Sequence, residues 1–291
     1  MNETKSKSKL VLATRIHLGK ASVPPPQEEI NKTILKFVQT SINCNAICAG
    51  IAVEDSSEKI PGYNLLYSIK IAISKAIEEI ACTGTDVQSD FIHIIPVRPW
   101  GNFVPALNAL ISWCCNLSIS SVNNNEMNEL LFISAETDMS CNTINKLQSN
   151  LIKEDTLVVG VAFPGQHEYN KGENALTGVT SPWNTAALWN LDKLALTGFP
   201  LVSEGLHPCK DGDGAGPSGV EEVSAIAVLQ KILTPTLAKA KLIQCDDIEW
   251  VTKWDDKERE EWHKKKMASK VARPKRHLEL LGLYDGVVLH C

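Results

Sequence analysis

An α/β domain with a mostly parallel sheet and helices on both faces is the fold class that the sequence predicts. Apolar runs of strand length alternate with amphipathic helical segments over residues 10–163, which is the order of parallel βαβ units. The chain has 291 residues and 44% hydrophobic side chains, enough for one large core. We therefore expect a single large domain.

The predicted strands are continuous apolar runs, which is typical of strands buried on both faces. KLVLATRI is the first such run, and TLVVGVAF is the fifth. The five strands are predicted at residues 9–16, 45–54, 90–97, 129–136 and 156–163. The run AKAKLIQCDDI (238–248) is predicted to add an edge strand.

The predicted helices carry apolar residues three and four positions apart. In the second helix, for example, Ile69, Ile73 and Ile77 fall on one face. Helices are predicted directly after the prolines at 24–26 and at 63–81, 103–115, 143–151 (with Asn142 as N-cap), 184–196, 220–233 and 255–271. Residues 164–182 and 198–219 read as long loops, which in a compact domain are usually functional or mobile.

Composition excludes several classes of protein. The net charge of −5 argues against a general nucleic-acid binder. No run of about 18 apolar residues predicts a membrane span, and the N-terminus lacks the apolar stretch of a signal peptide. The nine cysteines are odd in number and form no CxxC, so we expect free thiols in a reducing compartment, the cytoplasm. Neither a P-loop nor a GxGxxG motif is present.

Polar side chains follow the predicted strands at their carboxyl ends, where sheets of this class bind ligands. They are Thr14, Arg15, Glu54, Asp55, Arg98, Glu136 and Asp138. Glu136 and Asp138 lie one residue apart after a buried strand, and carboxylate oxygens suit Mg²⁺ or Mn²⁺ bound with substrate phosphates. The alternative is an ordinary acidic loop before the next helix.

Two further pairs of residues are candidates for a site. Glu221 and Glu222 open a predicted helix, where one carboxylate raises the pKa of the other and makes it a candidate general base. Acids in a first helical turn also simply favour the positive end of the helix dipole. Trp183 and Asn184 follow a Ser-Pro turn that is expected to be exposed, so they could contact a sugar acceptor, whereas Trp189 is expected in the core.

The order of these features resembles a nucleotide-sugar glycosyltransferase of GT-A fold, similar to family 2, over roughly residues 10–233. The elements that carry the resemblance are the acidic loop at 54–55, Gly101 with the ALN run at 106–108, the ETD run at 136–138, and the segments 197–199 and 219–222. The family has Asp at the first acidic position of its DxD motif, where this chain has Glu136.

The resemblance implies a role for each matching residue. Glu54 or Asp55 would bind the nucleoside, and Gly101 and Asn108 would bring a helix close to the donor. Glu136 and Asp138 would hold the divalent ion against the diphosphate, with His277 as a further ligand. Glu221 or Glu222 would be the catalytic base. Residues 1–9 would be a tail, 10–163 the nucleotide-binding half, 164–250 the acceptor-side half, and 251–291 a charged C-terminal helix and tail.

The implied activity is transfer of a sugar from a nucleotide diphosphate to an acceptor that the sequence does not identify. A sugar-phosphate nucleotidyltransferase is the alternative, although its Gly-rich basic loop is poorly matched by TRIHLGKASVPPP (14–26). A binding protein of the same fold that has lost the chemistry is the third hypothesis.

Overall fold

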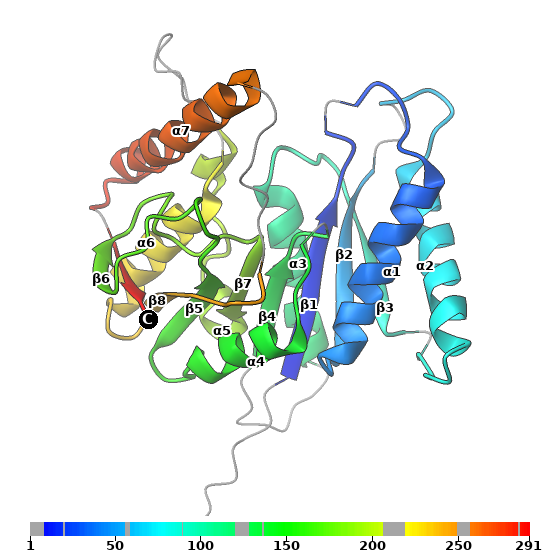
Figure 1. Cartoon of the computed structure of the whole chain (residues 1–291). Coiled ribbons are helices and arrows are strands. Elements are labelled where there is room, and N and C mark those ends of the chain that lie inside the picture. Colours follow the sequence, from blue (N-terminus) through cyan, green and yellow to red (C-terminus); the bar gives the residue numbers. More distant parts are fainter. Residues whose placement is uncertain are drawn as a thin grey trace, which may run out of the picture.

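The structure of the protein is a computed structural model. It describes residues 9–19, 21–55, 59–88, 90–119, 128–135, 137–205, 219–248, 257–284 and 286–291. These residues form one nine-stranded sheet flanked by helices (Figure 1). The predicted α/β class, mostly parallel sheet and single domain are confirmed.

The sheet has the strand order β3-β2-β1-β4-β7-β5-β8-β9-β6. Its strands are β1 (Lys9–Ile16), β2 (Cys48–Glu54), β3 (Ile92–Val97), β4 (Asn128–Ile133), β5 (Thr156–Val161), β6 (Gly172–Ala175), β7 (Ala186–Asn190), β8 (Lys239–Ile243) and β9 (Val287–His290). Five of the eight pairings are parallel, and β7 runs antiparallel to both β4 and β5. The chain runs outward from β1 through β2 to β3 and then returns to β4 on the other side of β1.

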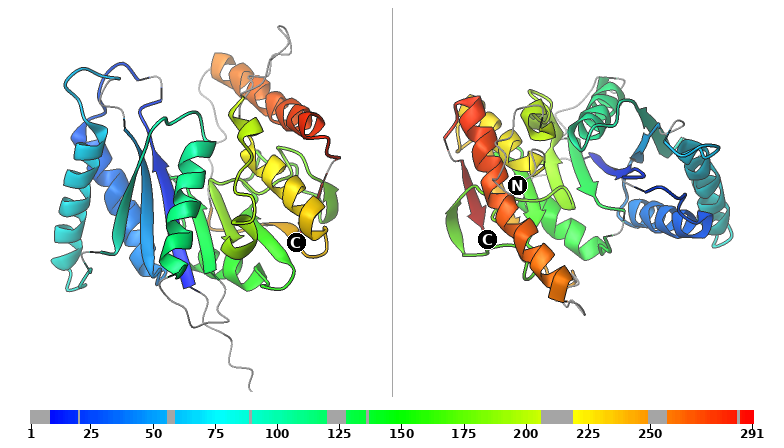
Figure 2. Two further views of the ribbon diagram at one scale, coloured as in Figure 1. Left: turned by 180° about the vertical axis from the view of Figure 1, so that it is seen from behind. Right: turned by 90° about the horizontal axis from the view of Figure 1, so that it is seen from above.

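Helices cover both faces of the sheet. They are α1 (Gln27–Asn43), α2 (Leu65–Ala81), α3 (Val104–Ile119), α4 (Cys141–Asn150), α5 (Leu191–Leu194), α6 (Glu221–Leu233) and α7 (Lys257–Leu281), with the 3-10 helix η1 at Leu201–Glu204. The core on one face combines α1, α2 and α4, and the core on the other face combines α3, α5 and α6. In the view from behind, α3 and α6 both lie in front of the sheet (Figure 2, left). The helix α7 packs against α6 and η1.

Local sequence explains why the central strands accept helices so closely. All seven residues of β2 are buried, as its apolar sequence CAGIAVE predicts. A β-carbon at Gly50 would lie 2.3 Å from the Trp113 ring, so glycine is what lets α3 lie directly on β2. Burial of each large aliphatic side chain in such a layer contributes about 2 kcal/mol.

The structure corrects several predicted elements, mostly after residue 164. Residues 184–196 are not a helix: they form β7 and then the short α5, because the apolar run Ala186–Asn190 is buried on both sides between β4 and β5. The strand β8 is not at an edge, since β9 lies beyond it. The strands β6 and β9 fall in segments predicted as loop and tail. The side chain that caps α4 is Ser140, not Asn142, and accepts from Thr143 N.

Neither a membrane-spanning helix nor a disulfide is found among the described residues. None of the described helices is long and apolar enough to cross a membrane. Eight cysteines are described and all are free thiols, whereas Cys209 lies outside the described residues.

Candidate functional site

A cavity of about 370 Å³ opens at the carboxyl ends of β1 and β4. Thr14 and Arg15 of β1 line it, together with His17, which follows β1. Trp100, before α3, and Asn184, before β7, complete this part of the lining. This is where the chain order along the sheet reverses, so it is the place at which open α/β sheets bind ligands. A volume of this size falls in the range of small-molecule sites, about 300–1,000 Å³.

Two polar atoms in this cavity lack a hydrogen-bond partner among the described residues: Thr14 Oγ1 and Trp100 Nε1. Thr14 is 1% exposed and Trp100 is 8% exposed, so neither atom is compensated by bulk water. The Trp100 ring stacks on His17 with 5.4 Å between centroids and 30° between planes. Buried polar atoms without partners are rare in folded proteins, so these two are candidates for contact with a ligand.

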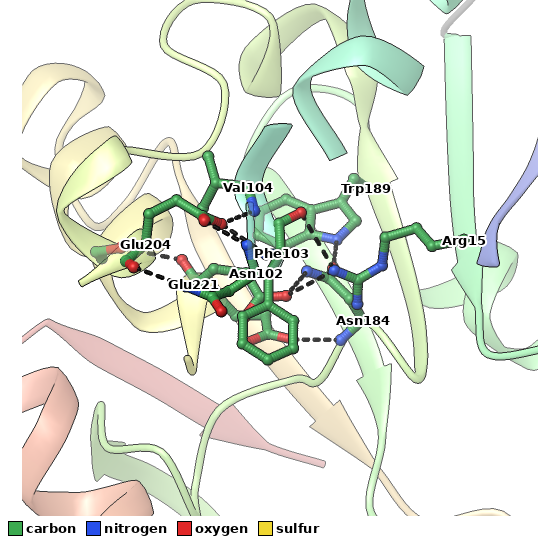
Figure 3. A network of polar contacts seen from close by, with 10 residues as sticks. Arg15, Asn102, Phe103, Val104, Asn184, Trp189, Glu204 and Glu221 are labelled. Atoms are coloured by element: carbon green, nitrogen blue, oxygen red, sulfur yellow. Dashed lines mark hydrogen bonds and ion pairs between the residues drawn. The ribbon is translucent and has the colours of Figure 1, made fainter. Parts of the chain in front are cut away.

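Arg15 is the one lysine or arginine among the described residues that line the cavity. Its Nη1 lies 3.4 Å from Glu221 Oε1 and 3.4 Å from the Phe103 carbonyl oxygen (Figure 3). Its side chain is 23% exposed and lies over the Phe103 ring. The guanidinium is thus oriented by two partners, and part of the Arg15 side chain is exposed at the cavity.

The carboxyl pair Glu221–Glu222 begins α6 and is buried. Asn184 connects the pair to the cavity, since its backbone N–H donates to Glu222 Oε1 at 2.6 Å and its side chain lies 3.5 Å from Glu221 Oε1. Asn184 is itself fixed by Trp189 Nε1, which donates to its side-chain oxygen at 3.0 Å. Burial, and then the negative charge of Glu221, raise the pKa of Glu222 to about 8. Glu222 is therefore more easily protonated than an exposed glutamate.

A third buried acid, Glu204 of η1, lies beside this network and was not predicted from the sequence. The backbone N–H groups of Asn102, Phe103 and Val104 all donate to its carboxylate, the first two at 2.6 Å (Figure 3). The carboxylate thereby caps the start of α3. A β-carbon at Gly101, which has φ +66°, would lie 2.5 Å from Glu204 Oε2. Gly101, predicted to approach a donor, instead admits this carboxylate.

The structure brings together some of the predicted site residues: Thr14, Arg15, Asn184, Glu221 and Glu222. Others lie apart from the cavity. Glu54 accepts from Leu18 N at 2.8 Å and pairs with Lys59 at 2.7 Å, so it holds the segment after β1. Asn108 exchanges two hydrogen bonds with the backbone of Phe199 and fixes that segment to α3. Asp55 and Arg98 do not line the cavity either.

Trp183 is not an exposed platform for a sugar ring. Its side chain is buried, its Nε1 donates to the Gly178 carbonyl at 2.8 Å, and its ring contacts His167 and the Lys270 ammonium. The predicted exposed turn is therefore wrong, because α7 packs directly on this segment at Gly178. Trp189 is fully buried, as predicted.

Two of the three predicted metal ligands lie in different surroundings, and the third is outside the described residues. The Asp138 side chain is 90% exposed and pairs with Lys36 at 3.4 Å. His277 is fully buried in α7, and Glu136 lies outside the described residues. Within the described ranges, no group of three His, Cys, Asp or Glu residues could hold a metal ion. Two of the three predicted ligands lie in the part of the chain that the structure describes, and Mg²⁺ or Mn²⁺ stays a prediction.

No protein-family model and no curated protein sequence matches the chain. Among solved structures, the chain is similar to a 4-diphosphocytidyl-2C-methyl-D-erythritol synthase, with 11% identity and a TM-score of 0.40 over 90% of this chain and 99% of that chain. The synthase of the same name from Anaerococcus prevotii is 8% identical, with a TM-score of 0.40 over 88% of this chain and 94% of its own. Identities and TM-scores this low carry no weight for the activity, which we infer from the site itself.

Proposed function

We propose that the chain is a nucleotidyltransferase that binds a nucleoside triphosphate in the cavity at the ends of β1 and β4 and transfers the nucleotide to a sugar phosphate. The observation that carries this proposal is the combination of an oriented guanidinium, Arg15, with two buried polar atoms that lack partners among the described residues, Thr14 Oγ1 and Trp100 Nε1, in one cavity. A planar base, a ribose and a charged phosphate chain together supply what these groups need.

The parts of a nucleotide match separate parts of the cavity. The stacked His17–Trp100 pair offers an aromatic wall for a base, and Trp100 Nε1 can only donate, so it selects an acceptor atom. Arg15 offers a planar fork of N–H donors, which suits phosphate oxygens. The guanidinium lies between the cavity and Glu221, where it would stabilise charge that develops on the phosphate chain.

The reaction requires little proton transfer. An oxygen of the sugar phosphate attacks the α-phosphorus, a new P–O bond forms, and the bond to pyrophosphate breaks with its electron pair on the leaving oxygen. The attacking phosphate is already ionised at neutral pH, so no carboxylate base must face the cavity. Among the described lining residues the only carboxylate is Glu29, which is exposed in the first turn of α1. Glu221 and Glu222 then act by orienting Arg15 and Asn184.

Glycosyl transfer is the second candidate, and one observation favours it. Glu222 has a pKa near neutrality, as a residue that takes a proton from an acceptor hydroxyl requires. This activity would use a nucleotide-diphosphate sugar in the same cavity and release a nucleoside diphosphate. It would require Glu222 to reach the cavity past Asn184, whose backbone N–H its carboxyl accepts.

The experiment compares ligands by thermal shift and then by product. Nucleoside triphosphates at about a hundredfold excess over Kd should stabilise the chain by about 2.7 kcal/mol, and triphosphate plus sugar 1-phosphates should release pyrophosphate. Arg15→Lys keeps the charge beside Glu221 but loses the planar fork, so we expect affinity for the triphosphate to fall about tenfold. Arg276→Lys, on an exposed pair with Glu279, is the matched control and should bind normally.

Each outcome of this experiment has a definite meaning. Release of a nucleoside diphosphate from a nucleotide sugar, without pyrophosphate, would replace the proposal with glycosyl transfer. A lack of stabilisation by any nucleotide would overturn both activities and favour the non-catalytic binding protein. Equal affinity of the Arg15→Lys and wild-type chains would show that Arg15 does not bind the phosphates.

A further inference from the structure

Two cysteine thiols from distant segments face each other on the side of the sheet that α1, α2 and α4 cover. Cys44 follows α1 directly and Cys141 is the first residue of α4, 97 positions further along the sequence. Their sulfur atoms are 3.7 Å apart, and Cys141 Sγ also lies 3.2 Å from the Asn43 carbonyl oxygen. The end of α1 and the helix α4 lie side by side at the lower edge of Figure 1.

Both thiols are half-buried, and of the other described cysteines only Cys115 shares this exposure. Cys48, Cys114 and Cys245 are buried among apolar side chains, and Cys82 and Cys291 are exposed. A half-buried thiol is within reach of a small reagent and is shielded from a second protein chain. The Cys44–Cys141 pair therefore favours a bond within the chain over one between chains.

We propose that Cys44 and Cys141 are a redox modification site that forms a reversible disulfide with a low-molecular-weight disulfide as oxidant. The two sulfur atoms would have to approach from 3.7 Å to about 2.05 Å, which rotation of the two side chains at the ends of their helices can supply. Neither residue belongs to the cavity, so the inference does not depend on the proposed activity.

The exchange balances with oxidised glutathione as the co-reactant. The Cys141 thiolate attacks one glutathione sulfur, and the first glutathione leaves as a thiolate that takes up a proton. The Cys44 thiolate then attacks the Cys141 sulfur of the mixed disulfide, and the second glutathione leaves in the same way. The protein loses two electrons and two protons, and one glutathione disulfide becomes two glutathione thiols.

The environments of the two thiols set this order of events. Burial, and then the hydrogen bond to Cys141, raise the pKa of the Cys44 thiol to about 12, so Cys44 is a poor first nucleophile. Cys141, the half-buried first residue of α4, is then the thiol that attacks first. Once Cys141 is in the mixed disulfide, the fixed neighbouring position of Cys44 makes its attack effectively unimolecular.

The experiment treats the full chain with oxidised glutathione and then analyses thiols and peptides. The number of thiols that react in denaturant should fall by two from nine, and mass spectrometry should find Cys44 linked to Cys141. Because the bridge closes a loop of about 97 residues, the melting temperature should rise by about 5–10 °C and return after dithiothreitol. Cys44→Ser and Cys141→Ser should each abolish the link and the rise.

Cys48→Ser and Cys82→Ser are the matched controls, and both should keep the link and the rise in melting temperature. The proposal is overturned if Cys44 and Cys141 both remain alkylatable after oxidation, or if the link joins other cysteines or two chains. It is also overturned if glutathione remains attached to Cys141 in the wild-type chain, since Cys44 would then not reach it. Peptide mapping of the wild-type chain decides these points even where a serine variant folds poorly.

Discussion

Glu204 and Glu222 are both buried glutamates beside the start of a helix, yet their surroundings differ. Three backbone N–H groups at the start of α3 donate to the Glu204 carboxylate. Glu222 accepts a hydrogen bond from the backbone N–H of Asn184 and has the carboxylate of Glu221 beside it. Burial and this neighbouring charge raise the pKa of Glu222 to about 8. Glu222 thus combines burial with a like charge beside it, and these two causes outweigh its backbone hydrogen bonds and raise its pKa.

Replacing Glu204, which accepts three backbone hydrogen bonds, should have the largest effect on the free energy of unfolding. Glu204→Ala leaves the N–H groups of Asn102, Phe103 and Val104 without their acceptor in a largely buried site. We expect the free energy of unfolding to fall by about 4 kcal/mol, measured by urea denaturation. Glu28→Ala, at the exposed first turn of α1, is the control and should lose about 0.5 kcal/mol. A loss under about 1 kcal/mol for Glu204→Ala would show that other groups cap α3.

Replacing Glu222, which has a like charge beside it, should change how the free energy of unfolding depends on pH. The unfolded chain releases this proton near its ordinary pKa of about 4.3, whereas the folded chain retains it up to about pH 8. Between these values the folded state binds more protons, so the stability of the wild-type chain falls as pH rises through this window. Glu222→Gln cannot ionise and should avoid this loss.

Urea denaturation of Glu222→Gln and the wild-type chain between about pH 5 and pH 8 measures the difference. We expect the variant to gain on the order of 3 kcal/mol relative to wild type across this range. Glu173→Gln, on the exposed strand β6, should show no such trend. A constant difference between Glu222→Gln and wild type at all pH values would mean that Glu222 is ionised in the folded chain.

The first half of the fold was predictable because its signals are local. Each strand from β1 to β5 is one apolar run, and α1 and α2 repeat apolar residues at helical spacing. The strand β7 was not predictable in this way, because its sequence AALWN also suits a buried helix. Only its insertion between β4 and β5, which run antiparallel to it, makes it a strand.

The candidate site was predictable residue by residue but not as an arrangement. Arg15 at a strand end and Glu221 at a helix start were each singled out by position, and 206 residues separate them in the sequence. No sequence signal identified Glu204, whose role arises from contacts about 100 residues away. The same limit explains Asn108: a match to a family motif gave it a donor contact, whereas its side chain is occupied by Phe199.

Asp138 extends the comparison to a carboxylate that is exposed, and its replacement should have the smallest effect. Its ion pair with Lys36 joins two accessible side chains, and such pairs contribute about 0–1 kcal/mol. We expect Asp138→Ala to change the free energy of unfolding by less than about 0.5 kcal/mol and to leave nucleotide-induced stabilisation, with and without Mn²⁺, as in the wild-type chain. Lys36→Ala is the matched control for loss of the ion pair. If Asp138→Ala alone abolished a Mn²⁺-dependent shift, Asp138 would have to leave Lys36 and turn toward the nucleotide, and the metal site predicted from the sequence would be the better account.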